Sequence, residues 1–266
     1  MKAGRARVYP PPGHITRRLG ISIEPDAEDP EIIRTAMPLA PELFIHGRFR
    51  LAAVGIMVDL AAGTLGVRAV QPDWTATFDL ASHRIGEAEP NSIAEGVTRL
   101  VRAGKNTVVS ETIVTAAGVP IVYGETTFQR LPRRSDNPAG TSLNTVRHLG
   151  RDEEPITAPV GEVIGLRAVG EGLVEFDLSD MIRNSFDSIQ GGVAGVALEE
   201  AGMSLTGPGS SVDFLHMYFL TAAKVGPYRA SATALARSPE RVTGRVELND
   251  VGNQRLLIQG TFVASP

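Results

Sequence analysis

Two stretches of this sequence, VGIMVDLAAG at 54–63 and VAGVALEEAG at 193–202, align without a gap at a constant offset of 139 residues. Both are apolar on nearly every face of a helix, whereas a surface helix carries a single apolar stripe. A helix that is apolar all round has to be enclosed by other parts of the fold. The sequence therefore indicates an internal duplication, with one enclosed helix in each copy, near residues 52–65 and 191–204.

Strand-like segments surround each helix in the same order. After the first helix they lie at 74–80, 95–102, 107–115 and 121–128, and after the second at 211–220, 228–236, 243–248 and 255–263. Each half also opens on two strand candidates, at 15–23 with 32–37 and at 163–169 with 173–178. An antiparallel sheet wrapped round one helix satisfies this order, so we predict an α+β fold. We expect the two sheets to join edge to edge into one long sheet, because pairing the edges removes unpaired strand groups.

Composition and turn content predict the domain organisation. Of the 266 residues, 42% are hydrophobic and 21% are charged, which is ordinary for a soluble globular protein with a sizeable core. Residues 130–159 are polar, rich in turn-forming types and without a sustained period. We therefore expect an N-terminal unit at 1–132, a linker at 133–158 and a C-terminal unit at 159–266.

The same composition excludes several classes of function. There is no cysteine, so a disulfide framework, a thiolate metal site and a cysteine nucleophile are excluded, and a cytoplasmic location is expected. The net charge of -4 gives no broad footprint for nucleic acid. The longest apolar stretch, near 51–66, is interrupted by Asp59 and falls short of the ~20 residues of a membrane span. The five histidines show no metal-ligand spacing.

The second half carries a chemical motif just before and within its helix. Asn184 is followed after five residues by Gln190, Gly191 and Gly192, and after six more by Glu199. This spacing resembles that of hotdog acyl-CoA thioesterases of the phenylacetate-pathway type, which have Asn, five residues, His-Gly-Gly, six residues, and Asp or Glu. The resemblance covers most of residues 160–266 and implies a tandem, or double, hotdog. Gln190 departs from the family's histidine, and Asp187 stands where the family often has glycine.

The resemblance also implies a role for each motif residue. The amide of Gly191 would polarise the thioester carbonyl, since free amides at a helix N-terminus stabilise a developing oxyanion. Glu199 would act as nucleophile or as general base for water, with Glu200 as the alternative, and Asn184 would position the reacting groups. Further contacts to the substrate are expected from Gln190, Gly192 and Met203.

The first half departs further from the motif. At the offset of 139 residues, Leu60 stands for Glu199, and Asp59 is one residue out of register, about 100° round the helix. The positions of Asn184, Gly191 and Gly192 are taken by Ile45, Ala52 and Ala53. We therefore expect the first half's own site to be inactive. The motif also resembles that of 4-hydroxybenzoyl-CoA thioesterases, in which a threonine four residues after the acid assists across the interface between paired hotdogs. In the first half, Thr64 stands four residues after Leu60. The resemblance therefore implies that Glu199 and Thr64 share one site.

These features favour an acyl-CoA thioesterase that needs no cofactor beyond the CoA of its substrate. Arginine suits phosphate binding, and the candidates for the CoA phosphates are Lys224, Arg229, Arg237 and Arg241. Two alternatives stay open. A non-catalytic acyl-CoA or acyl-carrier binding module is favoured by the loss of the first site and by Gln190, whereas a hydratase or dehydratase requires an Asp–His pair that the second half lacks. A homo-oligomer is expected, because single hotdogs commonly pair.

Overall fold

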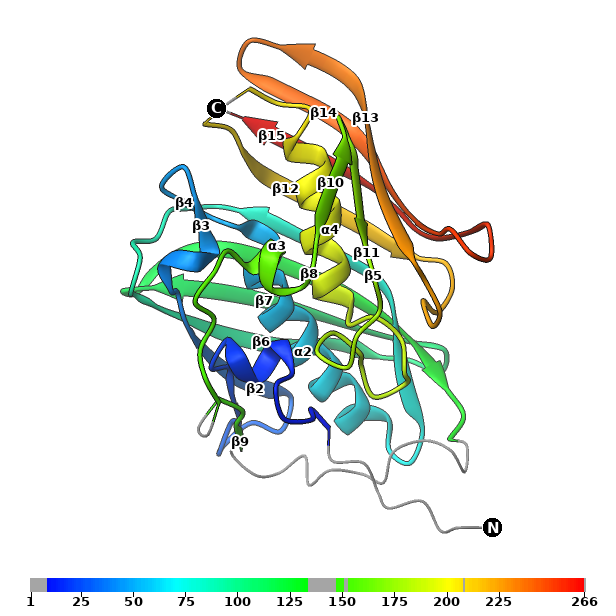
Figure 1. The fold of residues 1–266 in the computed structure, drawn as a ribbon. Helices are drawn as coiled ribbons and strands as arrows, with labels where there is room; N and C mark the ends of the chain where they lie inside the picture. The colour runs from blue at the N-terminus through cyan, green and yellow to red at the C-terminus, as the bar shows by residue number, and fades with distance from the viewer. Residues whose placement is uncertain (1–8, 134–146, 151–152, 208, 266) are drawn as a thin grey trace.

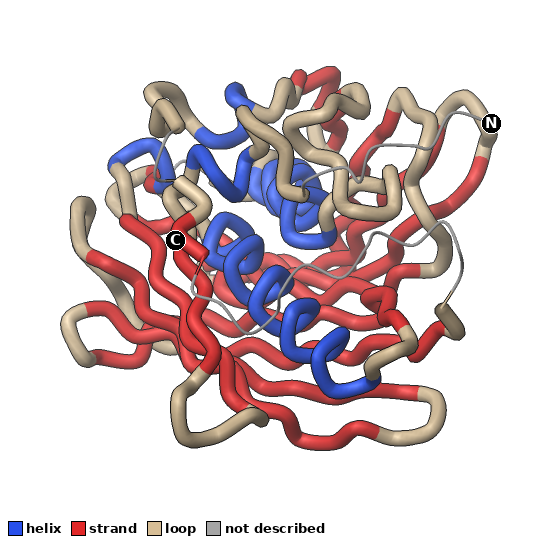
Figure 2. Tube along the Cα trace, turned by 90° about the horizontal axis from the view of Figure 1, so that it is seen from below, coloured by secondary structure: helices blue, strands red, loops and turns tan. Residues whose placement is uncertain are grey.

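One antiparallel sheet that curves around two helices makes up most of the molecule (Figures 1 and 2). The computed structural model describes residues 9–133, 147–150, 153–207 and 209–265. The sheet has 13 strands in the order β10-β11-β13-β14-β15-β12-β5-β8-β7-β6-β2-β1-β9. The predicted pair of sheets joined into one is therefore confirmed.

The elements repeat in the two halves of the chain. The first unit contains α1 (Ile15–Arg18), β1 (Ser22–Pro25), β2 (Ile32–Pro38), η1 (Pro41–Leu43), β3 (Phe44–Ile45), β4 (Arg48–Phe49), α2 (Leu51–Val70), β5 (Trp74–Arg84), β6 (Ile93–Ala103), β7 (Thr107–Ala116) and β8 (Val119–Leu131). The remaining elements are β9 (Arg147–His148), α3 (Val160–Val163), β10 (Arg167–Gly170), β11 (Leu173–Phe176), α4 (Gly191–Met203), β12 (Ser211–Phe219), β13 (Tyr228–Ser238), β14 (Arg241–Asp250) and β15 (Arg255–Ser265).

The two units meet where β12 pairs with β5. The strands run antiparallel, with Leu215 opposite Ser82 and Met217 opposite Leu80. Leu80, Ser82, Leu215 and Met217 are all buried, so the inner face continues across the junction. This junction places α2 and α4 next to each other in the hollow of a single sheet, as Figure 2 shows.

Both helices are enclosed, as their all-apolar sequences predict. In α4 every residue from Gly191 to Glu199 is buried. The longer helix α2 has the length and composition of a membrane span, yet 72% of its most apolar window is buried inside the fold. The apolar composition of α2 is therefore that of a core helix, because the sheet and α4 cover its apolar surface.

The helices approach closely at Gly192. A Cβ atom added there would lie 2.4 Å from Ile56 Cα and 2.7 Å from Ile56 N, so backbone would have to move. We expect Gly192→Ala to lower the free energy of unfolding by about 1–3 kcal/mol, as overpacking in a core does. Urea denaturation measures this. Gly207→Ala is the control, since a Cβ there would meet nothing within 4 Å; an equal loss in both variants would contradict the close approach.

Two expectations about segment ends need correction. Residues 15–23 are not one strand: Ile15–Arg18 is helical, because the His14 side chain accepts a hydrogen bond from Thr16 N and caps this turn. Likewise, the strand expected at 163–169 begins only at Arg167, because α3 ends at Val163 and a turn follows it. Residues 134–146 and 151–152 of the predicted linker lie outside the described residues, and within the linker β9 pairs with β1 at the sheet edge.

Candidate active site

Two carboxylates, one from each long helix, lie at the N-terminus of the opposite helix. Glu199 Oε1 of α4 accepts a hydrogen bond of 2.8 Å from the amide of Leu51, the first residue of α2. Asp59 of α2 accepts hydrogen bonds from the amides of Gly191 and Gly192, the first residues of α4. Each carboxylate thus satisfies free N–H groups and the positive end of the facing helix.

This reciprocal arrangement corrects the register of the duplication. Asp59 is the ninth residue of α2 and Glu199 is the ninth residue of α4. The structural offset between the halves is therefore 140 residues, and the expectation that Asp59 is out of register was wrong. One signal in the sequence favoured the correct offset: at 140 residues Gly55 falls on Gly195 and Asp59 falls on Glu199.

Glu199 lies in a buried ion pair. Its Oε2 accepts a hydrogen bond of 3.0 Å from Arg50 Nε, and its side chain is only 1% exposed. Arg50 Nη1 also lies 2.7 Å from Glu200 Oε2. Burial alone would lower the pKa of Arg50, but the two carboxylates raise it above its usual value. Both oxygens of Glu199 are therefore occupied, and a cation balances its charge.

Asp59 has only neutral partners around its carboxylate. Gln190 Nε2 donates to Oδ2 at 2.7 Å, and Thr77 Oγ1 of β5 donates to Oδ1 at 3.1 Å. Within the residues that the structure describes, no lysine, arginine or histidine forms an ion pair with Asp59. Burial raises the pKa of Asp59 to about 6, against the hydrogen bonds from Thr77 and the two glycine amides, which lower it. This carboxylate is therefore ionised at neutral pH and weakly basic.

Gln190 fixes the orientation of this group. It is the N-cap residue of α4, and its Oε1 accepts a hydrogen bond of 2.8 Å from Val193 N. The amide nitrogen consequently points to Asp59. Arg50, the N-cap residue of α2, reaches Glu199 in the same way. At the N-cap position, the first half therefore has a cation, Arg50, and the second half has a neutral amide, Gln190.

Asn184 shapes the loop that leads to Gln190. Its Oδ1 accepts from the amides of Phe186 and Ser188 at 2.9 and 3.0 Å, and its Nδ2 donates to Ile189 O at 3.2 Å. Asp187 in this loop has φ +57°, a conformation that glycine or aspartate adopts at low cost, which accounts for the residue type there. The loop also brings Phe186 against Trp74 of β5, with ring centroids 5.5 Å apart.

Thr64 lies in the part of α2 beyond Asp59, away from Glu199. Its Oγ1 donates to Leu60 O at 2.8 Å and accepts from Arg147 Nη2 at 3.4 Å. Leu51, which holds Glu199, is 13 residues earlier in the helix, about 20 Å along its axis. The expectation that Glu199 and Thr64 share a site is therefore wrong. Met203 ends α4, where it packs partly buried against the core.

The arginines proposed for the CoA phosphates lie in other parts of the second unit. Arg237 Nη1 donates to Leu205 O at 2.7 Å. Leu205 lies just past the C-terminal end of α4, about 20 Å from Gly191 along the helix axis. Arg241 lies across the β13–β14 hairpin from Ser238. Arg229 pairs with Glu175 at 2.6 Å, and Lys224 is exposed. Phosphate binding by these four residues stays a prediction.

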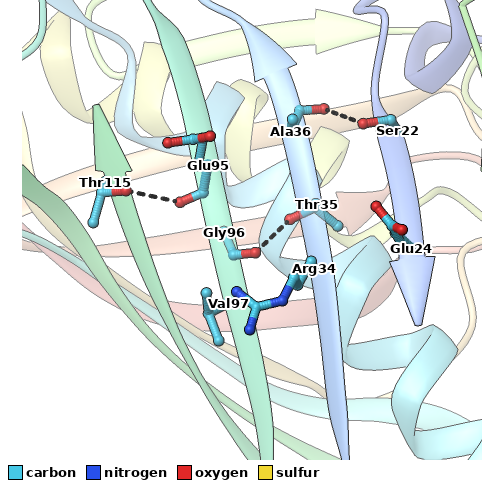
Figure 3. A pocket seen from close by; sticks show the side chains of 9 residues that line it. All are labelled: Ser22, Glu24, Arg34, Thr35, Ala36, Glu95, Gly96, Val97 and Thr115. Atoms are coloured by element: carbon cyan, nitrogen blue, oxygen red, sulfur yellow. Dashed lines mark hydrogen bonds between the residues drawn. The ribbon is translucent and has the colours of Figure 1, made fainter. Parts of the chain in front are cut away.

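A depression of about 350 Å³ on the sheet is separate from this site (Figure 3). It is lined by Ser22, Glu24, Arg34, Thr35, Ala36, Glu95, Gly96, Val97 and Thr115. Because side chains alternate along a strand and Ile23 and Ile33 are buried under the helices, Glu24 and Arg34 point to the outer face. The depression thus opens away from Asp59. No group of three or more His, Cys, Asp or Glu that could hold a metal ion occurs in the described part of the chain.

No model of a known protein family matches the sequence, and no curated protein matches it either. Several solved structures are similar over nearly the whole chain. A putative thioesterase from Novosphingobium aromaticivorans has 14% identity and a TM-score of 0.59, covering 91% of this chain and 97% of that one. An acyl-ACP thioesterase from Bacteroides thetaiotaomicron has 11% identity and a TM-score of 0.61, covering 90% and 100%. An acyl-CoA thioesterase II from Mycobacterium marinum has 13% identity and a TM-score of 0.60, covering 94% and 97%.

Identities this low establish a shared fold and nothing further. Together with the sheet order and the two enclosed helices, they show that the chain has the double hotdog fold expected from its sequence.

Proposed function

We propose that this protein hydrolyses acyl thioesters, with Asp59 as its catalytic carboxylate. The observation that carries the proposal is the environment of Asp59: a buried carboxylate without a cation, at the N-terminus of α4, held by Gln190 and Thr77. Burying a carboxylate without a cation is unfavourable for folding, so such a group is a candidate for chemistry. Its counterpart Glu199, which is ion-paired with Arg50, gives the contrast within the same molecule.

The geometry supports general-base catalysis. Asp59 takes a proton from a water molecule, whose oxygen attacks the thioester carbonyl and forms a tetrahedral intermediate. The amides of Gly191 and Gly192 already donate to Asp59, so the negative charge on the former carbonyl oxygen is stabilised by the positive end of the α4 dipole beside Asp59. The C–S bond then breaks, and the proton held by Asp59 passes to the leaving thiolate. The products are the carboxylic acid and the free thiol.

Gln190 and Thr77 hold the base in place. Each donates one hydrogen bond to a different oxygen of Asp59, so the carboxylate plane is fixed before a substrate enters. Preorganised donors of this kind cost no rearrangement at the moment of reaction. The substrate class that fits this chemistry is an acyl group on CoA or on the phosphopantetheine of a carrier protein, and the direct test is release of free thiol from both. A protein that binds these thioesters without turnover would favour a binding module.

The pH dependence of turnover tests the assignment of the base. With a pKa raised to about 6 by burial, Asp59 is protonated below that pH and ionised above it. We therefore expect kcat/KM to rise through about pH 6 and to level off above pH 7, as it does for a general base. Tyr9, the titratable neighbour of Asp59, has a pKa raised by burial and stays neutral over this range. A rate that is constant from pH 4.5 to 7.5, with circular dichroism unchanged, would exclude Asp59 as the base.

A further inference from the structure

Two arginines near the site have no carboxylate partner. Arg68 Nη1 of α2 is buried and has no hydrogen-bond acceptor. Arg147 of β9 donates to Thr64 Oγ1 at 3.4 Å, and burial lowers the pKa of its guanidinium. Among the described residues, neither arginine forms an ion pair. Arg68 and Arg147 are both half-buried, and charges shielded from water are normally paired, as Arg50 is with Glu199 in this molecule.

Arg68 and Arg147 both belong to the face of α2 that carries Thr64. Arg68 follows Thr64 by four residues, so the two side chains are neighbours on the helix surface. Side chains on a helix lean towards its N-terminus, which directs Arg68 over Thr64. Arg147 already contacts Thr64 from β9. The helix spacing of Arg68 and the contact of Arg147 thus put both arginines next to Thr64 on the same face of α2.

This cationic face lies along the helix from the proposed base. Arg68 is nine residues after Asp59, about 14 Å along the axis of α2. The phenol of Tyr9 interacts electrostatically with both Asp59 and Arg147, which places all three groups in one neighbourhood. The pantetheine arm has about as many bonds between its sulfur and its phosphate as four extended residues, roughly 15 Å. When the thioester group lies at Asp59, the phosphate at the other end of the pantetheine arm can therefore reach Arg68 and Arg147.

We propose that Arg68 and Arg147 bind the phosphate at the end of the pantetheine arm of the substrate. This inference rests on the proposed thioester hydrolysis and specifies which residues bind the phosphate of its substrate. Arginine presents several donors in a fixed fork, which matches the oxygens of a phosphate. CoA and the phosphopantetheine of a carrier protein share this phosphate, so the site fits either carrier.

The test compares three thioesters of one acyl group: acyl-CoA, acyl-phosphopantetheinyl carrier protein, and acyl-pantetheine without phosphate. In Arg68→Gln and Arg147→Gln we expect KM for a phosphate-bearing substrate to rise roughly tenfold or more, as loss of a charged hydrogen bond predicts. The kcat and the KM for acyl-pantetheine should stay within about twofold. Arg68→Lys, which keeps the charge, should recover part of the affinity. The matched control is Arg255→Gln at the exposed start of β15.

A rise in KM that is equal for acyl-CoA and acyl-pantetheine would overturn the proposal, as would an unchanged KM for both phosphate-bearing substrates. A response with only one of these two substrates supports it and identifies the carrier. Calorimetry measures the affinity for free CoA and for free pantetheine without any turnover, so it tests the phosphate site separately from the proposed hydrolysis. If the native protein hydrolyses no thioester but loses CoA affinity in the arginine variants, the hydrolase proposal fails and the phosphate site stands.

Discussion

Replacing Asp59 with asparagine is expected to lower kcat for thioester hydrolysis at least ~100-fold, as removal of a general base does. Asparagine has nearly the same shape and still accepts a hydrogen bond, but it cannot take a proton from water. Asp79→Asn, a half-buried carboxylate of β5 beside His216, is the matched control and should keep its turnover. Release of free thiol, measured under saturating substrate, reports kcat for both variants.

The same variant should change how the stability of the protein depends on pH. Because the pKa of Asp59 is about 6 in the fold against an ordinary 3.8, the fold prefers its protonated form. Ionised Asp59 therefore costs stability, and this cost grows as the pH rises from about 4 to about 6 and stays constant above. Asparagine cannot ionise, so we expect Asp59→Asn to abolish this decrease in the free energy of unfolding between about pH 4 and pH 6, measured by urea denaturation. Marked destabilisation at pH 7.5 would mean that the activity loss reflects unfolding.

Much of the fold could be predicted from the sequence because it depends on local patterns. The apolar pattern of the two helices predicts that they are enclosed. In β6, β7 and β14, buried residues alternate with more exposed ones over most of the strand. The edge pairing of β5 with β12 follows from the need to satisfy strand edges, but the choice of these two strands comes from packing across the whole molecule. Short ends such as Ile15–Arg18 were predicted wrongly, since one cap decided them.

The site was less predictable, because its partners are distant in the sequence. The loop motif drew attention to Asn184, Gln190, Gly191 and Gly192, yet Gln190 donates to Asp59, which is 131 residues away. Within an apolar helix, one residue of register is hard to fix, since small and aliphatic residues match at either offset. Only the reciprocal contacts of Asp59 and Glu199 with the facing helix ends resolve it.

Replacing Glu199 with glutamine is expected to destabilise the protein by about 3 kcal/mol while turnover per folded molecule is kept. Arg50 is only 4% exposed, and loss of one member of a buried ion pair typically costs about 3–5 kcal/mol. The lower value applies because Glu200 still faces Arg50 at 2.7 Å. Urea denaturation gives the change in unfolding free energy. Glu200→Gln is the control, and since its side chain is 36% exposed, a loss below about 1 kcal/mol is expected.

A double-variant cycle with Arg50→Gln separates charge from shape. The double replacement removes both charges together and places a neutral amide at the N-cap of α2, as Gln190 does at the N-cap of α4. We therefore expect the double variant to be more stable than the sum of the two single losses predicts, because neither charge is left unpaired. If Glu199→Gln instead leaves stability unchanged and lowers kcat ~100-fold or more, Glu199 is the catalytic carboxylate and Asp59 is not.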